Sequence, residues 1–166
     1  MGVGSSDRQA LLNNTIALAR TAVAFDLPVV VSTSASKVYS GPLMPPIQAV
    51  LPGVMALERR NMNVWEDDSV REAILKTQRR RLIVSGVLTE ACVSFPALST
   101  LTEGYEVYVV TDACGGITVD SHGVILAPAA SSGAAPGEAT AYVLATCKRC
   151  CVRSRASKVD GLRHLT

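Results

Sequence analysis

The sequence predicts an α/β fold, a three-layer doubly wound parallel sheet of the Rossmann-like kind. Two observations lead to this prediction. Short runs of apolar, mostly β-branched residues alternate with longer segments of helical periodicity, at the spacing of βαβ units. Two of these runs, residues 29–31 and 82–84, lack polar alternation, which is typical of parallel strands buried on both faces. Crossovers between such strands are right-handed.

The composition fits one globular domain. The chain has 166 residues, of which 48% are hydrophobic and 18% charged, so it is too apolar for a disordered chain. We assign the domain to residues 1–146 and expect the Arg-, Ser- and Cys-rich residues 147–166 to form a poorly ordered tail. A net charge of only +2 and an aromatic content of 4% argue against a nucleic-acid partner.

The sequence pattern predicts neither a membrane-spanning segment nor a signal peptide. No apolar run reaches the ~20 residues that cross a bilayer. Five cysteines, an odd number, then indicate reduced thiols and a cytoplasmic location. Cys147, Cys150 and Cys151 offer only half of a zinc motif, and the glycine pair at 115–116 is too short for a phosphate loop. We therefore expect neither a metal nor a cofactor.

The first half of the chain is expected to form one helix and two strands. Asp7 can cap the helix, and Pro28 follows its end. Strands are expected at residues 29–31 and 54–57, with a polar loop at 32–36 and a proline-rich loop at 41–53 that holds at most a short helix at 47–51. The apolar stripe of the helix has spacings of 4, 3 and 4 and consists of Leu12, Ile16, Ala19 and Val23.

The second half repeats the alternation. A helix capped by Asp67, Asp68 or Ser69 ends at the basic residues 79–81, which we interpret as a solvated helix end. A strand at 82–84, a helix at 90–103 that stops at Gly104, and a strand at 107–110 follow. The expected inner faces of the two helices are Val70, Ala73, Ile74 and Thr77, and Val93, Phe95, Ala97, Leu98 and Leu101.

Cys92 is the residue best positioned for chemistry. It follows the carboxyl end of the strand at 82–84, where a helix begins, and ligands of parallel sheets bind at this rim. A helix N-terminus stabilises a thiolate and offers free backbone N–H groups. Such a thiolate can attack a carbonyl carbon while the N–H groups hold the oxyanion. The alternative is that Cys92 is a small buried hydrophobic side chain.

The stretch LIVSGVLTEACVSFPALSTLTEGYEVYVVTDACGG, residues 82–116, resembles the isochorismatase-like cysteine hydrolases. That family includes nicotinamidases, N-carbamoylsarcosine amidohydrolases and isochorismatases. The chain is most similar to its YcaC-like branch, and the resemblance continues back through residues 61–67 and 13–19 to about Gly4. It implies an isochorismatase-like fold, a small-molecule substrate and a homo-oligomer.

The resemblance also implies a nucleophile and an oxyanion hole. The family's catalytic cysteine corresponds to Cys92. The oxyanion hole would consist of the backbone N–H groups of Leu88 and Cys92. A cis peptide would join Val87 and Leu88.

Members of the family use a catalytic triad of aspartate, lysine and cysteine. The lysine precedes an Asn-x-Asn-x-Trp loop. This chain has Glu58-Arg59-Arg60 there, and strict spacing from Cys92 would select Glu58. We choose Arg59, whose charge can stabilise a thiolate but which cannot readily donate and recover a proton. The alternative is that Arg59 is a solvated loop charge.

The third member of the triad is an aspartate at the end of the family's first strand. No corresponding apolar run precedes Asp7 in this sequence, so we expect the first strand and its aspartate to be missing. Cys92 would then hydrolyse a small amide-type C–N bond with impaired activity. The alternative is an inactive family member, or a truncated remnant, that acts only through oligomer assembly.

Other residues near the rim are candidates for a substrate pocket: Asn63, Trp65, Thr89, Glu90 and Phe95. The alternative for Trp65 is that it packs against the core. We expect Asp112 and Cys114 to close their strand rather than line the pocket, and His122 to lie at a helix start or on the surface.

Overall fold

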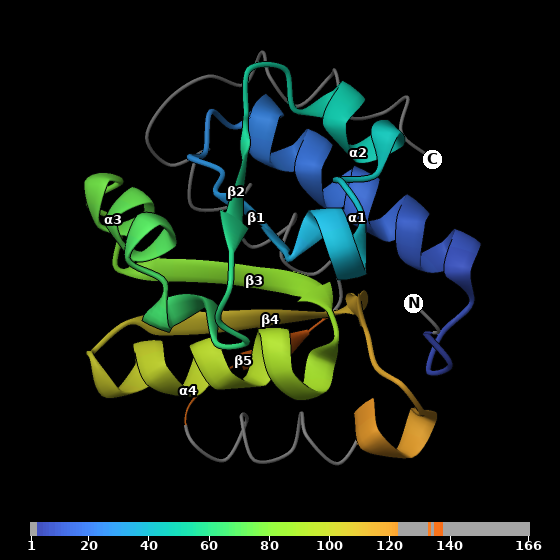
Figure 1. Ribbon diagram of the computed structural model, residues 1–166. Helices are drawn as coiled ribbons and strands as arrows, with labels where there is room; N and C mark the ends of the chain where they lie inside the picture. Colours follow the sequence, from blue (N-terminus) through green and yellow to red (C-terminus); the bar gives the residue numbers. More distant parts are fainter. Residues whose placement is uncertain (1–2, 123–132, 134, 138–166) are drawn as a thin grey trace.

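The computed structural model describes residues 3–122, 133 and 135–137, which form an α/β arrangement of helices around short parallel strands (Figure 1). The predicted tail, residues 147–166, and the end of the assigned domain lie outside the described residues. The described elements are, in order, α1 (Arg8–Ala24), β1 (Val31–Ser34), η1 (Ser36–Ser40), α2 (Pro45–Val50), β2 (Ala56–Arg59), η2 (Val64–Glu66), α3 (Asp68–Lys76), β3 (Arg81–Val87), η3 (Thr89–Val93), α4 (Ser94–Thr102), β4 (Glu106–Gly115) and β5 (Ala135–Gly137).

The first helix begins where the sequence predicts, but its contacts with β4 come from residues outside the predicted stripe. The Asp7 carboxylate accepts a hydrogen bond from the Ala10 amide (2.8 Å) and caps α1. Val23 of the expected stripe is 46% exposed, whereas Leu18 packs against β4. The face toward β4 also carries Asn14, whose amide donates to the Asp112 carbonyl (3.0 Å). Counting apolar residues alone missed this face because part of it is polar and hydrogen-bonded.

The strands β1 and β2 lie later in the sequence than predicted. The expected strand at 29–31 contributes only Val31, and the expected loop residues Ser32 to Ser34 complete β1. Likewise β2 occupies Ala56–Arg59 rather than 54–57. The two strands pair in parallel from Val31 opposite Ala56 to Ser34 opposite Arg59. Each boundary therefore depends on the partner strand, which the local sequence does not reveal.

The described strands form two parallel sheets rather than one. One sheet contains β1 and β2, and the other has the order β3-β4-β5. None of the described residues before α1, 3–7, lies in a strand. Within the described residues β3 is therefore an edge strand, and Ile83 and Val87 on it are each 39% exposed.

The strand β4 is longer than predicted and carries a bulge opposite the end of β3. It continues past Val110 to Gly115, so Asp112 and Cys114 lie within the strand. Val84 pairs with Val109, but Gly86 pairs with Cys114, so β4 has extra residues between these pairs. A bulge of this kind bends its strand and redirects the neighbouring side chains, and bulges are common next to active sites.

The core lies between β3, β4, α3 and α4. Ile74, Val93, Ala97 and Leu101 pack there as predicted, and Val70 of the predicted α3 face is buried as well. Two members of the predicted α4 face do not: Phe95 and Leu98 are 46% and 36% exposed. The buried core cluster consists of Trp65, Val93, Ala97, Tyr105, Val107, Val109 and Cys114.

Trp65 belongs to this core, as the packing alternative expects, and it is not among the residues that line the cavity beside α4. Its ring meets that of Tyr105 edge to face, with centroids 5.3 Å apart. Its indole N–H donates to Glu103 (2.7 Å), and the Arg71 guanidinium lies over the ring and pairs with the same carboxylate. A tryptophan fixed in this way anchors the loop at 61–66 to α4.

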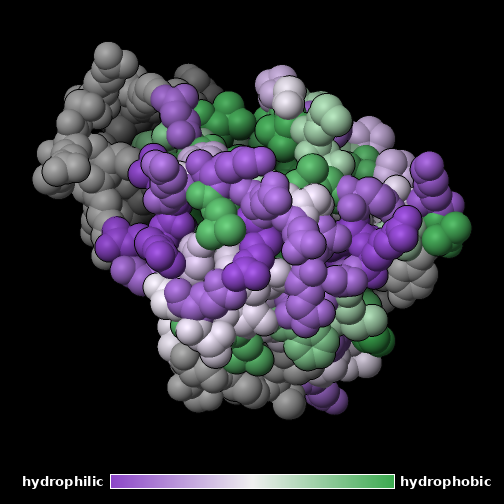
Figure 2. Space-filling model, turned by 60° about the vertical axis from the view of Figure 1, so that its left-hand side comes forward, coloured by the Kyte–Doolittle hydropathy of each residue, from purple (hydrophilic) through white to green (hydrophobic). Residues whose placement is uncertain are grey.

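The surface shown in Figure 2 is mostly hydrophilic, with hydrophobic side chains in separate islands. The basic run at 79–81 is exposed, as predicted, and Arg81 pairs with Glu106 (2.8 Å). Among the helices that the structure describes, none is both long and apolar enough to cross a membrane.

Truncation of the core at Val109 should be costly. Val109→Ala is expected to lower the free energy of unfolding by about 2 kcal/mol, because it removes two buried methyl groups and leaves a cavity. Val38→Ala is the matched control, since Val38 is 86% exposed. Urea unfolding followed by circular dichroism measures both. Equal midpoints for the two variants would contradict the assigned core.

Candidate active site around Cys92

Cys92 lies in a short turn that joins the end of β3 to α4. β3 ends at Val87, and the peptide bond between Val87 and Leu88 is cis, at the position that the family resemblance implies. The next five residues, η3, form a single π-helical turn that runs directly into α4. The predicted helix start at Glu90 is thus a π turn, a feature that occurs frequently at functional sites.

The thiols of Cys92 and Cys114 differ in exposure. Both cysteines are free, but Cys92 is partly exposed whereas Cys114 is completely buried in β4. Burial raises the pKa of the Cys114 thiol to about 12, so this thiol stays protonated at neutral pH. Of the two cysteines that the structure describes, Cys92 is therefore the one that can meet a small molecule.

The backbone around Cys92 is fixed by the Leu88 carbonyl. This oxygen accepts hydrogen bonds from the amides of Ala91 (3.3 Å) and Cys92 (2.9 Å). The Cys92 N–H, a member of the predicted oxyanion hole, is thus already engaged. A substrate oxygen would either share this N–H with the Leu88 carbonyl or replace the carbonyl as its acceptor.

Arg59 is buried at the end of β2 and supports the loop that follows. The residue is 4% exposed, and its Nη1 donates to the carbonyls of Asn61 and Met62, the latter at 3.0 Å. Its Nε is buried without a hydrogen-bond partner among the described residues. The alternative of a solvated loop charge is therefore wrong.

Glu58, which strict spacing from Cys92 would select, lies on the opposite face of β2. Its carboxylate accepts hydrogen bonds from the Ser36 amide (2.6 Å) and the Thr33 hydroxyl (3.0 Å). Hydrogen bonds from Ser36, and to a lesser degree Thr33, hold the pKa of Glu58 below its usual value. Because side chains alternate along a strand, Glu58 and Arg59 cannot serve the same site.

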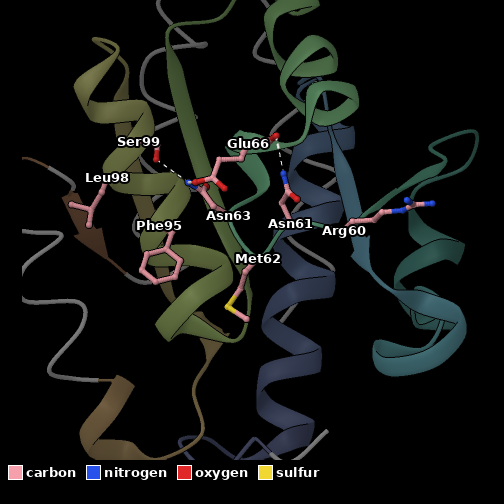
Figure 3. Close-up of a pocket in the computed structure, with 8 residues that line it drawn as sticks. All are labelled: Arg60, Asn61, Met62, Asn63, Glu66, Phe95, Leu98 and Ser99. Carbon is pink, nitrogen blue, oxygen red and sulfur yellow. Dashed lines mark hydrogen bonds between the residues drawn. The ribbon is translucent and has the colours of Figure 1, made fainter.

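A cavity of about 560 Å³ opens beside α4 and contains two of the predicted pocket residues, Asn63 and Phe95. The amide of Asn63 donates to Glu66 (3.1 Å) and to the Ser99 hydroxyl (3.0 Å), which links the loop to α4. Figure 3 shows Arg60 directed away from the other labelled side chains. The cavity is lined by Arg60, Asn61, Met62, Asn63, Glu66, Phe95, Leu98 and Ser99.

Thr89 and Glu90 do not line this cavity but contact residues that follow β4. Thr89 is completely buried, and its hydroxyl is 2.8 Å from Nδ1 of His122. The Glu90 carboxylate accepts hydrogen bonds from the Ile117 amide (2.7 Å) and the Ser121 hydroxyl (2.5 Å). Burial raises the pKa of Glu90, but the hydrogen bonds and the nearby His122 outweigh it, so the pKa lies below its usual value.

Some residues around the site could not be identified from sequence reasoning. Ser99 follows Cys92 by seven positions, a helical spacing that could have suggested a shared face. Ile117 and Ser121 gave no signal, because their contacts with Glu90 span 27 and 31 positions. In the described part of the chain, no three His, Cys, Asp or Glu side chains cluster as a metal site would require. Cys147, Cys150 and Cys151 lie outside the described residues.

The comparison with protein families gives one match that spans most of the chain. Residues 1–141 match the family model described as "Isochorismatase domain". Among curated proteins, the chain is 42% identical over 104 residues to "Probable hydrolase YcaC" of Escherichia coli (strain K12). The match covers 62% of this chain and 50% of that protein, so this chain spans half the length of its relative.

Two solved structures extend this similarity to three dimensions. YcaC from Pseudomonas aeruginosa, solved with hexane-2,5-diol and covalent acrylamide, is 33% identical with a TM-score of 0.82, over 85% of this chain and 70% of that one. The Escherichia coli YcaC gene product, described as an octameric hydrolase of unknown specificity, is 35% identical with a TM-score of 0.79. That match covers 82% of this chain and 67% of the other.

Selective labelling should separate the two described cysteines. Brief treatment of the folded protein with iodoacetamide at pH 8 is expected to alkylate Cys92 and to spare Cys114, whose thiol is buried and protonated. Cleavage after Glu103 and Glu106 releases the two cysteines on separate peptides for mass spectrometry. In denaturant both should react. Equal labelling of Cys114 in the folded protein would contradict the structure.

Proposed function

This chain belongs to the isochorismatase family, and from that membership we propose that it hydrolyses the C–N bond of a small amide with Cys92 as nucleophile. The observation that carries the proposal is the position of the thiol. Cys92 is partly exposed in a helical turn directly after a parallel strand, where ligands of such sheets bind. The buried Cys114 offers no comparable nucleophile.

The reaction would proceed through a thioester. The Cys92 thiolate attacks the amide carbonyl carbon, and the oxygen becomes negatively charged in the tetrahedral intermediate. The N–H groups of Leu88 and Cys92 would stabilise that oxygen. The C–N bond then breaks, and the amine leaves with a proton. Water attacks the thioester, which releases the acid and restores the thiol.

Arg59 would supply positive charge without transferring protons. Its guanidinium is buried, and among the described residues it pairs with no carboxylate, so a nearby anion would relieve an unfavourable charge. Asp7 is engaged as the cap of α1, so we do not propose it as an acid–base group.

The substrate would bind in the cavity beside α4. A volume of about 560 Å³ suits a small molecule, and Asn63 and Ser99 offer polar groups beside the apolar Phe95 and Leu98. Cys92 is not among the residues that line this cavity. The link between the two is Phe95, which lines the cavity and follows Cys92 by three positions along the continuous helical segment. The Pseudomonas aeruginosa relative carries a covalent acrylamide, an electrophile that adds to accessible thiols, which supports a reactive cysteine in this family.

A cytoplasmic location fits this chemistry. A nucleophilic thiol has to stay reduced, and both described cysteines are free. We propose a reducing compartment for that reason.

Assembly into a homo-oligomer is the second function that we propose, and it requires no catalysis. Three large apolar side chains around the cavity, Met62, Phe95 and Leu98, are 63%, 46% and 36% exposed. Exposed apolar groups that cluster in this way are typical of protein interfaces. The octameric Escherichia coli relative supports a partner of the same kind, a second copy of this chain.

Acrylamide should capture the nucleophile. Incubation is expected to add one acrylamide to the peptide that carries Cys92, while Cys92→Ser gains none there and hydrolyses a panel of small primary amides at the background rate. Cys114→Ala is the control and should keep both properties. Amide hydrolysis that survives in Cys92→Ser would exclude Cys92 as nucleophile.

Light scattering coupled to gel filtration tests the assembly. The wild-type chain is expected to elute with the mass of several copies, and Leu98→Glu to elute with a smaller mass, because a buried unpaired charge opposes association. Met55→Glu changes an equally apolar residue that is 82% exposed at another site and should leave the mass unchanged. A wild-type monomer would rule out this role.

A further inference from the structure

The π turn that carries Cys92 is held from outside by residues that follow β4. Glu90 accepts hydrogen bonds from the Ile117 amide and the Ser121 hydroxyl, and Thr89 bonds to His122. Two consecutive residues of the turn thus contact one short segment, residues 117–122. We call these three hydrogen bonds the clamp.

The clamp depends on a glycine at position 116. A Cβ built on Gly116 would lie 2.6 Å from Oε1 of Glu90 and 3.1 Å from Cβ of His122. Both distances are shorter than ordinary van der Waals contacts, so a side chain at 116 would push the carboxylate away. The close approach of backbone and carboxylate therefore requires glycine.

The segment that follows β4 is itself fixed on its other side. The Gly4 amide donates to the carbonyls of Gly116 (3.2 Å) and Ile117 (3.1 Å). The Gly116 amide in turn donates to the Ser5 hydroxyl (2.7 Å). The clamp is thus connected through hydrogen bonds to residues 4 and 5, which precede α1.

Inside the turn, hydrogen bonds fix the same residues from the opposite direction. The Leu88 carbonyl accepts from the amides of Ala91 and Cys92, and the Glu90 carbonyl accepts from the Ser94 hydroxyl (2.7 Å). Oε2 of Glu90 is buried and has no hydrogen-bond partner among the described residues. The turn is thus held both by its own backbone and by the clamp.

We propose that the clamp positions Cys92 for attack and that Glu90 is its principal positioning residue; this inference rests on the proposed function of Cys92. Glu90 is a positioning residue rather than a catalytic one, because its Oε1 is engaged by the Ile117 amide and the Ser121 hydroxyl and it does not line the cavity. It acts through the backbone of the turn. Misplacement of a reacting group by about 1 Å can cost about 10²-fold in rate.

Three variants separate positioning from charge. Both donors to Glu90 meet the same oxygen, Oε1, so Glu90→Gln can keep both hydrogen bonds while it removes the charge. Glu90→Ala removes both bonds. Glu72→Gln is the matched control, since Glu72 is exposed on α3 and pairs with Lys76 (3.5 Å).

Steady-state kinetics on small primary amides gives the first readout. Glu90→Ala is expected to lower kcat by about tenfold or more with KM changed by less than about twofold, because positioning acts on the reacting atoms rather than on substrate binding. Glu90→Gln and Glu72→Gln should stay close to wild type. Wild-type kinetics in Glu90→Ala, or an equal loss in Glu90→Gln, would overturn the proposal.

Amide hydrogen exchange over residues 88–93 gives a second readout that needs no turnover. Exchange should be about tenfold faster or more in Glu90→Ala and unchanged in Glu90→Gln, because only alanine opens the turn. If the wild-type chain hydrolyses no amide, the proposed function fails, and this measurement still decides the clamp: unchanged exchange in Glu90→Ala overturns it. Should Glu90→Ala not fold, Ser121→Ala removes one donor and should shift exchange in the same direction.

Discussion

The hydrogen bonds that the Leu88 carbonyl accepts from the amides of Ala91 and Cys92 are the constraint on which the candidate site depends. They close the turn that follows β3 and keep it helical up to the start of α4. The hydrogen bonds of Thr89 and Glu90 to residues after β4 then hold the closed turn from outside. One of the bonds to the Leu88 carbonyl engages the Cys92 N–H, so the donor that would stabilise an oxyanion is oriented before any substrate arrives. The Leu88 carbonyl and the oxyanion would then share this donor.

The two described cysteines illustrate how one fold gives the same side chain opposite properties. Cys114 lies inside β4, where helix and sheet exclude water, burial disfavours its thiolate and the side chain serves as core. Cys92 lies beyond the end of the neighbouring strand β3, where the backbone leaves the sheet and the residue is partly exposed. The bulge between these strands contributes to the difference, because it brings Cys114 opposite Gly86 while β3 continues for only one more residue.

Local signals in the sequence predicted much of the fold, and contacts between distant residues account for the errors. Asp7 and Asp67 cap their helices as expected, because a cap depends on three or four neighbouring residues. The polar inner face of α1, the limits of β1 and the core position of Trp65 depend on partners far along the chain, which periodicity cannot identify. At the site, the strand-to-helix junction and the family resemblance both pointed to Cys92, and the resemblance placed the cis peptide between Val87 and Leu88. The contacts of Thr89 and Glu90 with residues after β4 were not foreseen, because they join positions far apart in the sequence.

The central claim is that Cys92 attacks the substrate, and trapping the covalent intermediate tests it most directly. During turnover of a small amide, rapid quenching in acid followed by cleavage after Glu90 and Glu103 releases a peptide that contains Cys92. The account predicts that this peptide carries the acyl group of the substrate as a thioester, which disappears when the substrate is exhausted. Hydrolysis that proceeds with no acyl group on Cys92 at any time of quenching would contradict it.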